Sequence, residues 1–142
     1  MSNRNEPMRA YNFLVEIDGI ARAGFRECSG LDTTTAVIEY REGNEARTPR
    51  KLTGLTTYSN VTLRWGATTD TEIWNWRRTV IDGRPERRNG SIVMLNDLGE
   101  EQLRFNFREG WPTRYTVASL NATGNDVAVD ALEIAHEGLT LA

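Results

Sequence analysis

Alternation of apolar and polar positions is the feature that most constrains the fold of this chain. Near the start, large apolar residues stand two positions apart, at Tyr11, Phe13, Val15 and Ile17. Side chains two positions apart share one face of a strand, so this period predicts a half-buried strand. Asp18-Gly19 follows directly and favours a tight hairpin turn.

The same pattern predicts further strands along most of the chain. We expect them at residues 20–29, 33–41, 57–66, 91–95, 102–107, 115–120 and 127–139. These segments are enriched in the residue types that strands prefer, and Trp111-Pro112 is expected to end the strand before it. The pattern predicts one domain over residues 1–142 that is mainly β, a barrel or a sandwich, with residues 1–9 flexible.

A single segment has the helical period instead. Residues 70–82 place Ile73, Trp76 and Val80 on one face, which we expect to pack on the β wall. Thr69 and Glu72 have the spacing of a capping box. Gly83 can end the helix, and the proline two residues later prevents its continuation.

Residues 42–55 interrupt the strand pattern and are expected to form a long loop. Glycines and a proline punctuate it, and its charges are mixed in sign: Glu42, Glu45, Arg47, Arg50 and Lys51. A loop of this length inside a compact domain is uncommon and is often functional. It is therefore a candidate contact surface.

Residues that carry chemistry are scarce. His136 is the only histidine, so a histidine-based triad would need it. The Glu133-x-x-His136 spacing can serve a metal on a helix, but here it lies in a predicted strand, where positions three apart face opposite sides. No phosphate-binding glycine motif is present. We therefore expect no catalytic set, no cofactor and no metal, and a structural or binding role.

The basic residues are almost all arginine. Lys51 is the only lysine among the 17 basic residues, which fits either subunit interfaces or a GC-rich genome. An arginine-rich segment at 77–88 with nearby tryptophans suggests nucleic-acid binding, but interspersed acids and a net charge of −3 favour ion pairs to a neighbouring subunit.

Cys28 is the only cysteine, so no internal disulfide forms. The start lacks an apolar signal segment and no run could span a bilayer, so we expect a cytoplasmic protein without a membrane anchor.

The order of several short segments resembles one known family. They are Phe13–Gly19, Phe25–Leu31, Ile38–Asn44, Lys51–Leu55, Asn60–Gly66, Thr71–Trp76, Arg87–Ile92, Gly110–Pro112, Asn121–Asn125 and Leu132–Leu139. Together they resemble the tail tube proteins of contractile phage tails and of extracellular contractile injection systems, which are related in fold to the type VI secretion tube protein. Typical members carry proline where this chain has Thr53.

This resemblance implies a subunit of hexameric rings that stack into a tube inside a contractile sheath. Its partners would be further copies, the sheath protein, baseplate or hub proteins and a terminal cap, with a cargo protein or DNA in the lumen. If each subunit gave four strands, the closed wall would have a backbone diameter of about 50 Å and a lumen of roughly 40 Å. The particle would be released or act at an envelope.

Within that picture, two sets of residues receive roles. The alternation of the last strand places Glu133 and Glu137 on a small, acidic face, which together with Glu39 we expect to line the lumen. The charged loop 42–55 is expected to contact the next ring. Two alternatives stay open: a phage tail tube that conducts DNA, and a stand-alone β binding module that remains a monomer.

Overall fold

The computed structural model describes residues 12–20, 24–43 and 47–142. These residues form a mainly β structure with one helix, as predicted. Its elements are β1 (Phe13–Ile17), β2 (Phe25–Ser29), β3 (Thr33–Tyr40), β4 (Arg50–Tyr58), β5 (Val61–Gly66), α1 (Glu72–Ile81), β6 (Arg88–Leu95), β7 (Glu101–Thr116), β8 (Val129–Ala135) and β9 (Gly138–Leu141). The predicted Glu45 lies outside the described residues.

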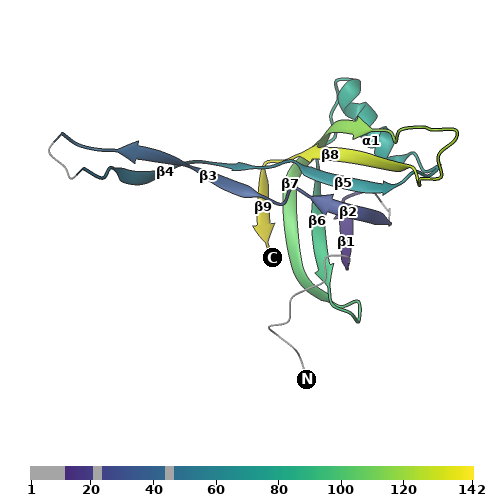
Figure 1. Cartoon of the computed structure of the whole chain (residues 1–142), viewed down its shortest axis with the longest axis horizontal. Helices are drawn as coiled ribbons and strands as arrows, with labels where there is room; N and C mark the ends of the chain where they lie inside the picture. The colour runs from purple at the N-terminus through teal and green to yellow at the C-terminus, as the bar shows by residue number, and fades with distance from the viewer. Residues whose placement is uncertain (1–11, 21–23, 44–46) are drawn as a thin grey trace.

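Seven of the strands form the body, in the antiparallel order β1-β6-β7-β8-β5-β2, with β9 also paired to β7. The long strand β7 belongs to two half-sheets. Half-sheet A contains β1, β6, residues 101–110 of β7 and β9, and half-sheet B contains β2, β5, β8 and residues 111–116 of β7. In Figure 1 the strands of one half-sheet run crosswise to those of the other. The body is thus a folded sheet that is not closed into a barrel.

The bend of β7 has a local cause. Glu109 has a positive φ of 55°, and the register of β7 shifts beside Gly110 and again between Pro112 and Arg114. Bulges let one strand turn the corner between two packed half-sheets. The prediction that Trp111-Pro112 ends this strand is wrong, because the proline is accommodated at the irregular position and β7 continues to Thr116.

One apolar cluster fills the space between the half-sheets. Its fully buried members come from both halves and from the helix, and they include Leu63, Trp65, Ile73, Trp76, Phe107, Leu132 and Ile134. On β8 the buried residues alternate with half-buried ones, as the period of two predicts. Burial of each large apolar side chain contributes about 1.5–3 kcal/mol.

The helix α1 lies within one residue or two of its predicted bounds, but its start differs. The Asp70 carboxylate accepts the backbone N–H of Glu72 at 2.9 Å, while the N-cap position is Thr71. The predicted capping box of Thr69 and Glu72 is therefore wrong. At the other end Gly83 has a φ of +78°, so it provides the left-handed residue that ends the helix.

The predicted loop 42–55 is shorter than expected. Its last part belongs to β4, which pairs antiparallel with β3 from Thr33↔Tyr58 to Tyr40↔Arg50. We call residues 33–58 the arm. Figure 1 shows the arm as a long ribbon that projects away from the body. The predicted strand 33–41 is confirmed as β3, whereas residues 50–55 of the predicted loop are strand and belong to β4.

The predicted last strand, 127–139, is in fact two strands. β8 ends at Ala135 and β9 starts at Gly138, with His136 and Glu137 between them. Both strands follow one another along β7, so the break coincides with the bend of β7. No helix in the described part of the chain has the length and hydropathy needed to span a bilayer.

Candidate assembly interface

The arm is a long and exposed feature of the described part of the chain. β3 and β4 pair with each other in a separate two-stranded sheet, and every β3 residue is exposed. An isolated two-stranded ribbon is only marginally stable in water. A ribbon of this length is therefore expected to be held by a partner surface.

Exposed apolar side chains lie in the middle and far parts of the arm. They are Val37, Ile38, Tyr40, Leu52 and Leu55, and Leu55 is 82% exposed. Ile38 lies opposite Leu52 in the register. A Cβ at Gly54 would lie 3.2 Å from Cγ1 of Ile38, so a side chain there would crowd this face. Apolar groups gathered on an exposed surface mark an interaction site.

The predicted charged residues occupy the far half of the arm. Glu42 and Arg47 are exposed in the turn, whereas Arg50 and Lys51 lie on β4. The Tyr40 hydroxyl donates a hydrogen bond to the Glu42 carboxylate at 2.8 Å, and this bond raises the pKa of Tyr40. The turn thus combines mixed charges with the apolar ribbon behind it, and sequence reasoning identified the charges but missed the apolar residues.

The three predicted lumen residues lie in different places. Glu133 is half-buried on β8, on the side of half-sheet B that faces away from the core. Glu39 lies near the far end of the arm, opposite Lys51. Glu137 lies between β8 and β9, where its carboxylate pairs with Arg87 and is 3.8 Å from Arg108. The structure does not gather these three residues into one cluster.

The predicted helix face lies against the body. Ile73 and Trp76 are each 1% exposed and belong to the core cluster, and Val80 is half-buried. Trp76 Nε1 donates to the backbone oxygen of Glu86 at 2.7 Å, and the Arg88 guanidinium lies 5.8 Å from the Trp76 ring centroid. These contacts fix α1 over the edge of the core.

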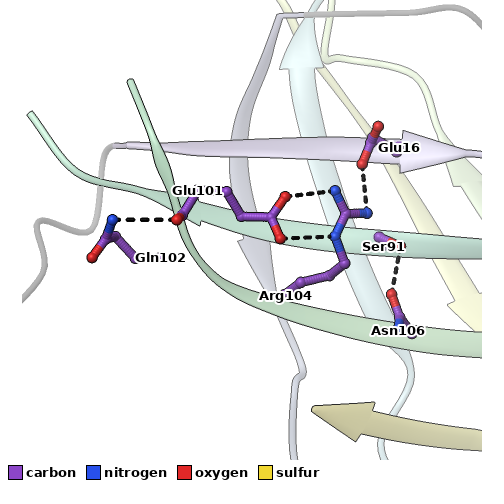
Figure 2. A network of polar contacts seen from close by, with 6 residues as sticks. All are labelled: Glu16, Ser91, Glu101, Gln102, Arg104 and Asn106. Carbon is purple, nitrogen blue, oxygen red and sulfur yellow. Dashed lines mark hydrogen bonds and ion pairs between the residues drawn. The ribbon is translucent and has the colours of Figure 1, made fainter. Parts of the chain in front are cut away.

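A polar network on half-sheet A was not predicted. Figure 2 shows Arg104 between two carboxylates, with Nη1 2.7 Å from Glu16 and Nη2 2.7 Å from Glu101. The hydrogen bond from Arg104 lowers the pKa of Glu101. Nearby, Ser91 and Asn106 are joined at 2.6 Å. The alternation of Arg104 and Asn106 on β7 indicated a polar face. It could not indicate the partner Glu16 on β1, which is 88 residues away in the sequence.

No group of three or more potential metal ligands occurs in residues 12–20, 24–43 and 47–142. Both ring nitrogens of His136 lie near backbone groups, Nε2 3.0 Å from the oxygen of Ser59 and Nδ1 3.2 Å from the nitrogen of Gly138. Burial, reinforced by the Glu27 carboxylate, raises the pKa of the Cys28 thiol to about 12. At neutral pH that thiol is protonated and a poor nucleophile.

Comparison with solved structures finds the same fold. A chain in the sheath/tube terminator of the PVC extracellular contractile injection system, in its extended state, is 30% identical with a TM-score of 0.88, covering 97% of this chain and 98% of that one. A chain of the PVC sheath–tube complex is 28% identical with a TM-score of 0.87, covering 100% and 98%. Hcp1 from Flavobacterium johnsoniae shares the fold at 14% identity and a TM-score of 0.58, covering 92% and 94%.

Comparison of sequences gives the family. Curated protein sequences yield no match. The family model described as T4-like virus tail tube protein gp19 matches residues 9–140, which is nearly the whole chain. The chain therefore belongs to the T4-like virus tail tube protein family.

Proposed function

We propose that this chain forms the inner tube of an extracellular contractile injection particle, as hexameric rings stacked inside a contractile sheath. The observation that carries the proposal is the likeness, over almost the full length of both chains, to chains of the PVC sheath–tube structures. The sheath, the baseplate or hub and a terminal cap are its partners, and a cargo protein or DNA passes through the lumen. Its role is structural rather than catalytic.

The exposed surfaces support assembly from further copies of the same chain. The arm presents apolar side chains that the body of its own subunit leaves uncovered. Each half-sheet also ends in an edge strand, such as β2 on half-sheet B, that has no second neighbour among the described residues. Open strand edges are a liability in a monomer and are removed by pairing around a ring.

We further infer that half-sheet B lines the lumen. Its outer face carries a row of small or charged side chains in register: Ser29, Thr62, Glu133 and Arg114. The next row contains an Arg64–Glu27 ion pair at 3.3 Å. These two rows form a hydrophilic strip across the face, which lets cargo slide, although the half-buried Trp111 lies on the same face opposite Ala135. Glu133 is thus the central lumen candidate, with Glu39 and Glu137 toward the rims.

The first test is the assembled state of the purified protein. We expect light scattering to find species far larger than the 16.1 kDa chain, and negative-stain microscopy to show rings and tubes. The physical reason is that association buries the arm and closes the sheet edges. A strictly monomeric protein at millimolar concentration, without rings, would contradict the assembly and favour the stand-alone binding module.

The second test concerns the lumen. In a Cys28→Ser background, a Glu133→Cys variant is expected to react with a small maleimide both as tubes and as dissociated subunits. A maleimide carried on a bulky polymer should label the dissociated subunits but react at least tenfold more slowly with tubes, because the bore excludes it. Equal labelling of tubes by the bulky reagent would place Glu133 on the outside.

A phage tail tube that conducts DNA is the second candidate, because the matching family model describes phage tail tube proteins. The neighbouring genes distinguish a phage tail tube from the tube of an injection particle. Capsid and terminase genes would indicate a phage, whereas an ATPase gene beside baseplate genes, without capsid genes, would indicate an injection particle.

A further inference from the structure

The arm joins the body through two short segments. Gly30–Asp32 leads from β2 into β3, and Ser59–Asn60 leads from β4 back into β5. Gly30 has a φ of +88°, and a Cβ there would lie 2.0 Å from the Asn60 oxygen, so the two segments cross in close contact. The Ser59 N–H donates to the Asp32 oxygen at 3.2 Å. The joint is therefore tight but consists of few backbone contacts.

One side chain of the body reaches this joint. His136, in the break between β8 and β9, places Nε2 3.0 Å from the Ser59 oxygen. A carbonyl oxygen only accepts hydrogen bonds, so Nε2 carries a proton and donates. Nδ1 lies 3.2 Å from both the nitrogen and the oxygen of Gly138, and in this tautomer it accepts the Gly138 N–H. The ring therefore contacts Ser59 of the joint on one side and the start of β9 in the body on the other.

Aromatic rings complete this contact. The His136 ring lies 5.7 Å from the ring of Tyr58, the last residue of the arm, and 5.9 Å from the ring of the buried Phe107. His136 thus links the core to the end of β4 by a hydrogen bond and by ring packing. β3 and β4 pair only with each other within the described ranges, so the direction of the arm depends on this joint.

We propose that His136 is a positioning residue that fixes the direction of the arm, and through it the fit of one ring on the next. The second part rests on the proposed function, together with the expectation that the charged turn of the arm contacts the next ring. The bend in β7 and the break between β8 and β9 bring His136 under the joint. Without the bond to Ser59, the arm pivots about the crossing of its two segments.

Matched substitutions separate the hydrogen bond from the packing. His136→Phe keeps an aromatic ring against Tyr58 and Phe107 but removes the donor to Ser59. His136→Asn reaches only to the position of Nδ1 and also loses that bond. His136→Gln carries an amide donor near the position of Nε2 and should restore it. If His136 acts only through ring packing, the Phe variant should be closest to the parent. If it acts through the hydrogen bond to Ser59, the Gln variant should be closest to the parent.

The experiment measures the direction of the arm and the stacking separately. Spin labels on Thr48→Cys and Leu98→Cys, in a Cys28→Ser background diluted into unlabelled protein, report the distance from the arm turn to the body. We expect the width of the distance distribution to at least double in the Phe and Asn variants and to stay near the parent in the Gln variant. Mean tube length in micrographs should fall severalfold in the Phe and Asn variants.

The outcomes are distinguishable. An unchanged distance distribution in both the Phe and the Asn variant overturns the role of His136. A broadened distance distribution with normal tube length supports the proposal that His136 fixes the direction of the arm. The same result contradicts the proposal that the arm is the contact between rings. If the Phe variant does not fold, the comparison of Asn with Gln still decides, because both side chains are amides and differ in reach.

Discussion

Replacing both Arg47 and Arg50 with glutamate is expected to leave the fold and the rings intact and to abolish stacking into tubes. Both residues lie in the far part of the arm, where we propose contact with the next ring. A single exposed ion pair contributes only about 0.2–1 kcal/mol. A hexameric ring repeats each loss six times, so the sum reaches several kcal/mol, and roughly 6 kcal/mol corresponds to about a 10⁴-fold change. Negative-stain microscopy gives the readout.

A matched control is available at the same two positions. Replacing Arg47 and Arg50 with lysine keeps both positive charges on exposed side chains of the arm. We expect this variant to form tubes of parental length at the same concentration. Long tubes from the glutamate variant would exclude the arm turn as the axial contact, while loss of tubes in both variants would show that the effect is not one of charge sign.

Trp76→Ala is expected to destabilise the subunit by about 3–5 kcal/mol, the range for large aromatic truncations in cores. Trp76 is 1% exposed, packs in the core cluster and donates to the Glu86 oxygen. The substitution leaves both a cavity and an unpaired backbone oxygen. For a domain of this size the midpoint of thermal unfolding should fall by about 10 °C, as measured by circular dichroism under dissociating conditions.

Trp74 provides the comparison within the same helix. It is 39% exposed and contacts Tyr115 edge to face, with the ring centroids 5.2 Å apart. We expect Trp74→Ala to cost well under half as much as Trp76→Ala in dissociated protein. Similar losses for the two would show that the helix has no dominant buried face.

The body could be predicted from the sequence because its strands bury one face. Phe13, Val15 and Ile17 gave a clear period, and Ile73 with Trp76 gave the helical one. The break at His136 could not be seen, because it arises where β8 and β9 follow the bend of β7. The cause of that break lies in another strand, so no local pattern records it.

The first strand of the arm, β3, was predicted at residues 33–41, but most of the second strand, β4, was not, for the opposite reason. Lys51 and Leu55 are exposed on their strand, so no buried face imposes an alternation there. Glycine, proline and mixed charges then suggest a loop. The strand β4 forms through its pairing with β3, and we propose that its apolar side chains contact another subunit. Neither the pairing partner nor a contact in an assembly can be seen in the local sequence of β4.

The uninterrupted course of β7 bears on how a tube would withstand the thrust of a contracting sheath. This 16-residue strand belongs to both half-sheets, so a push that arrives on one half reaches the other through covalent backbone rather than through a flexible connection. Close-packed interiors compress little and transmit strain. Each subunit can therefore act as a stiff strut, with its mechanical compliance concentrated at the joints between subunits.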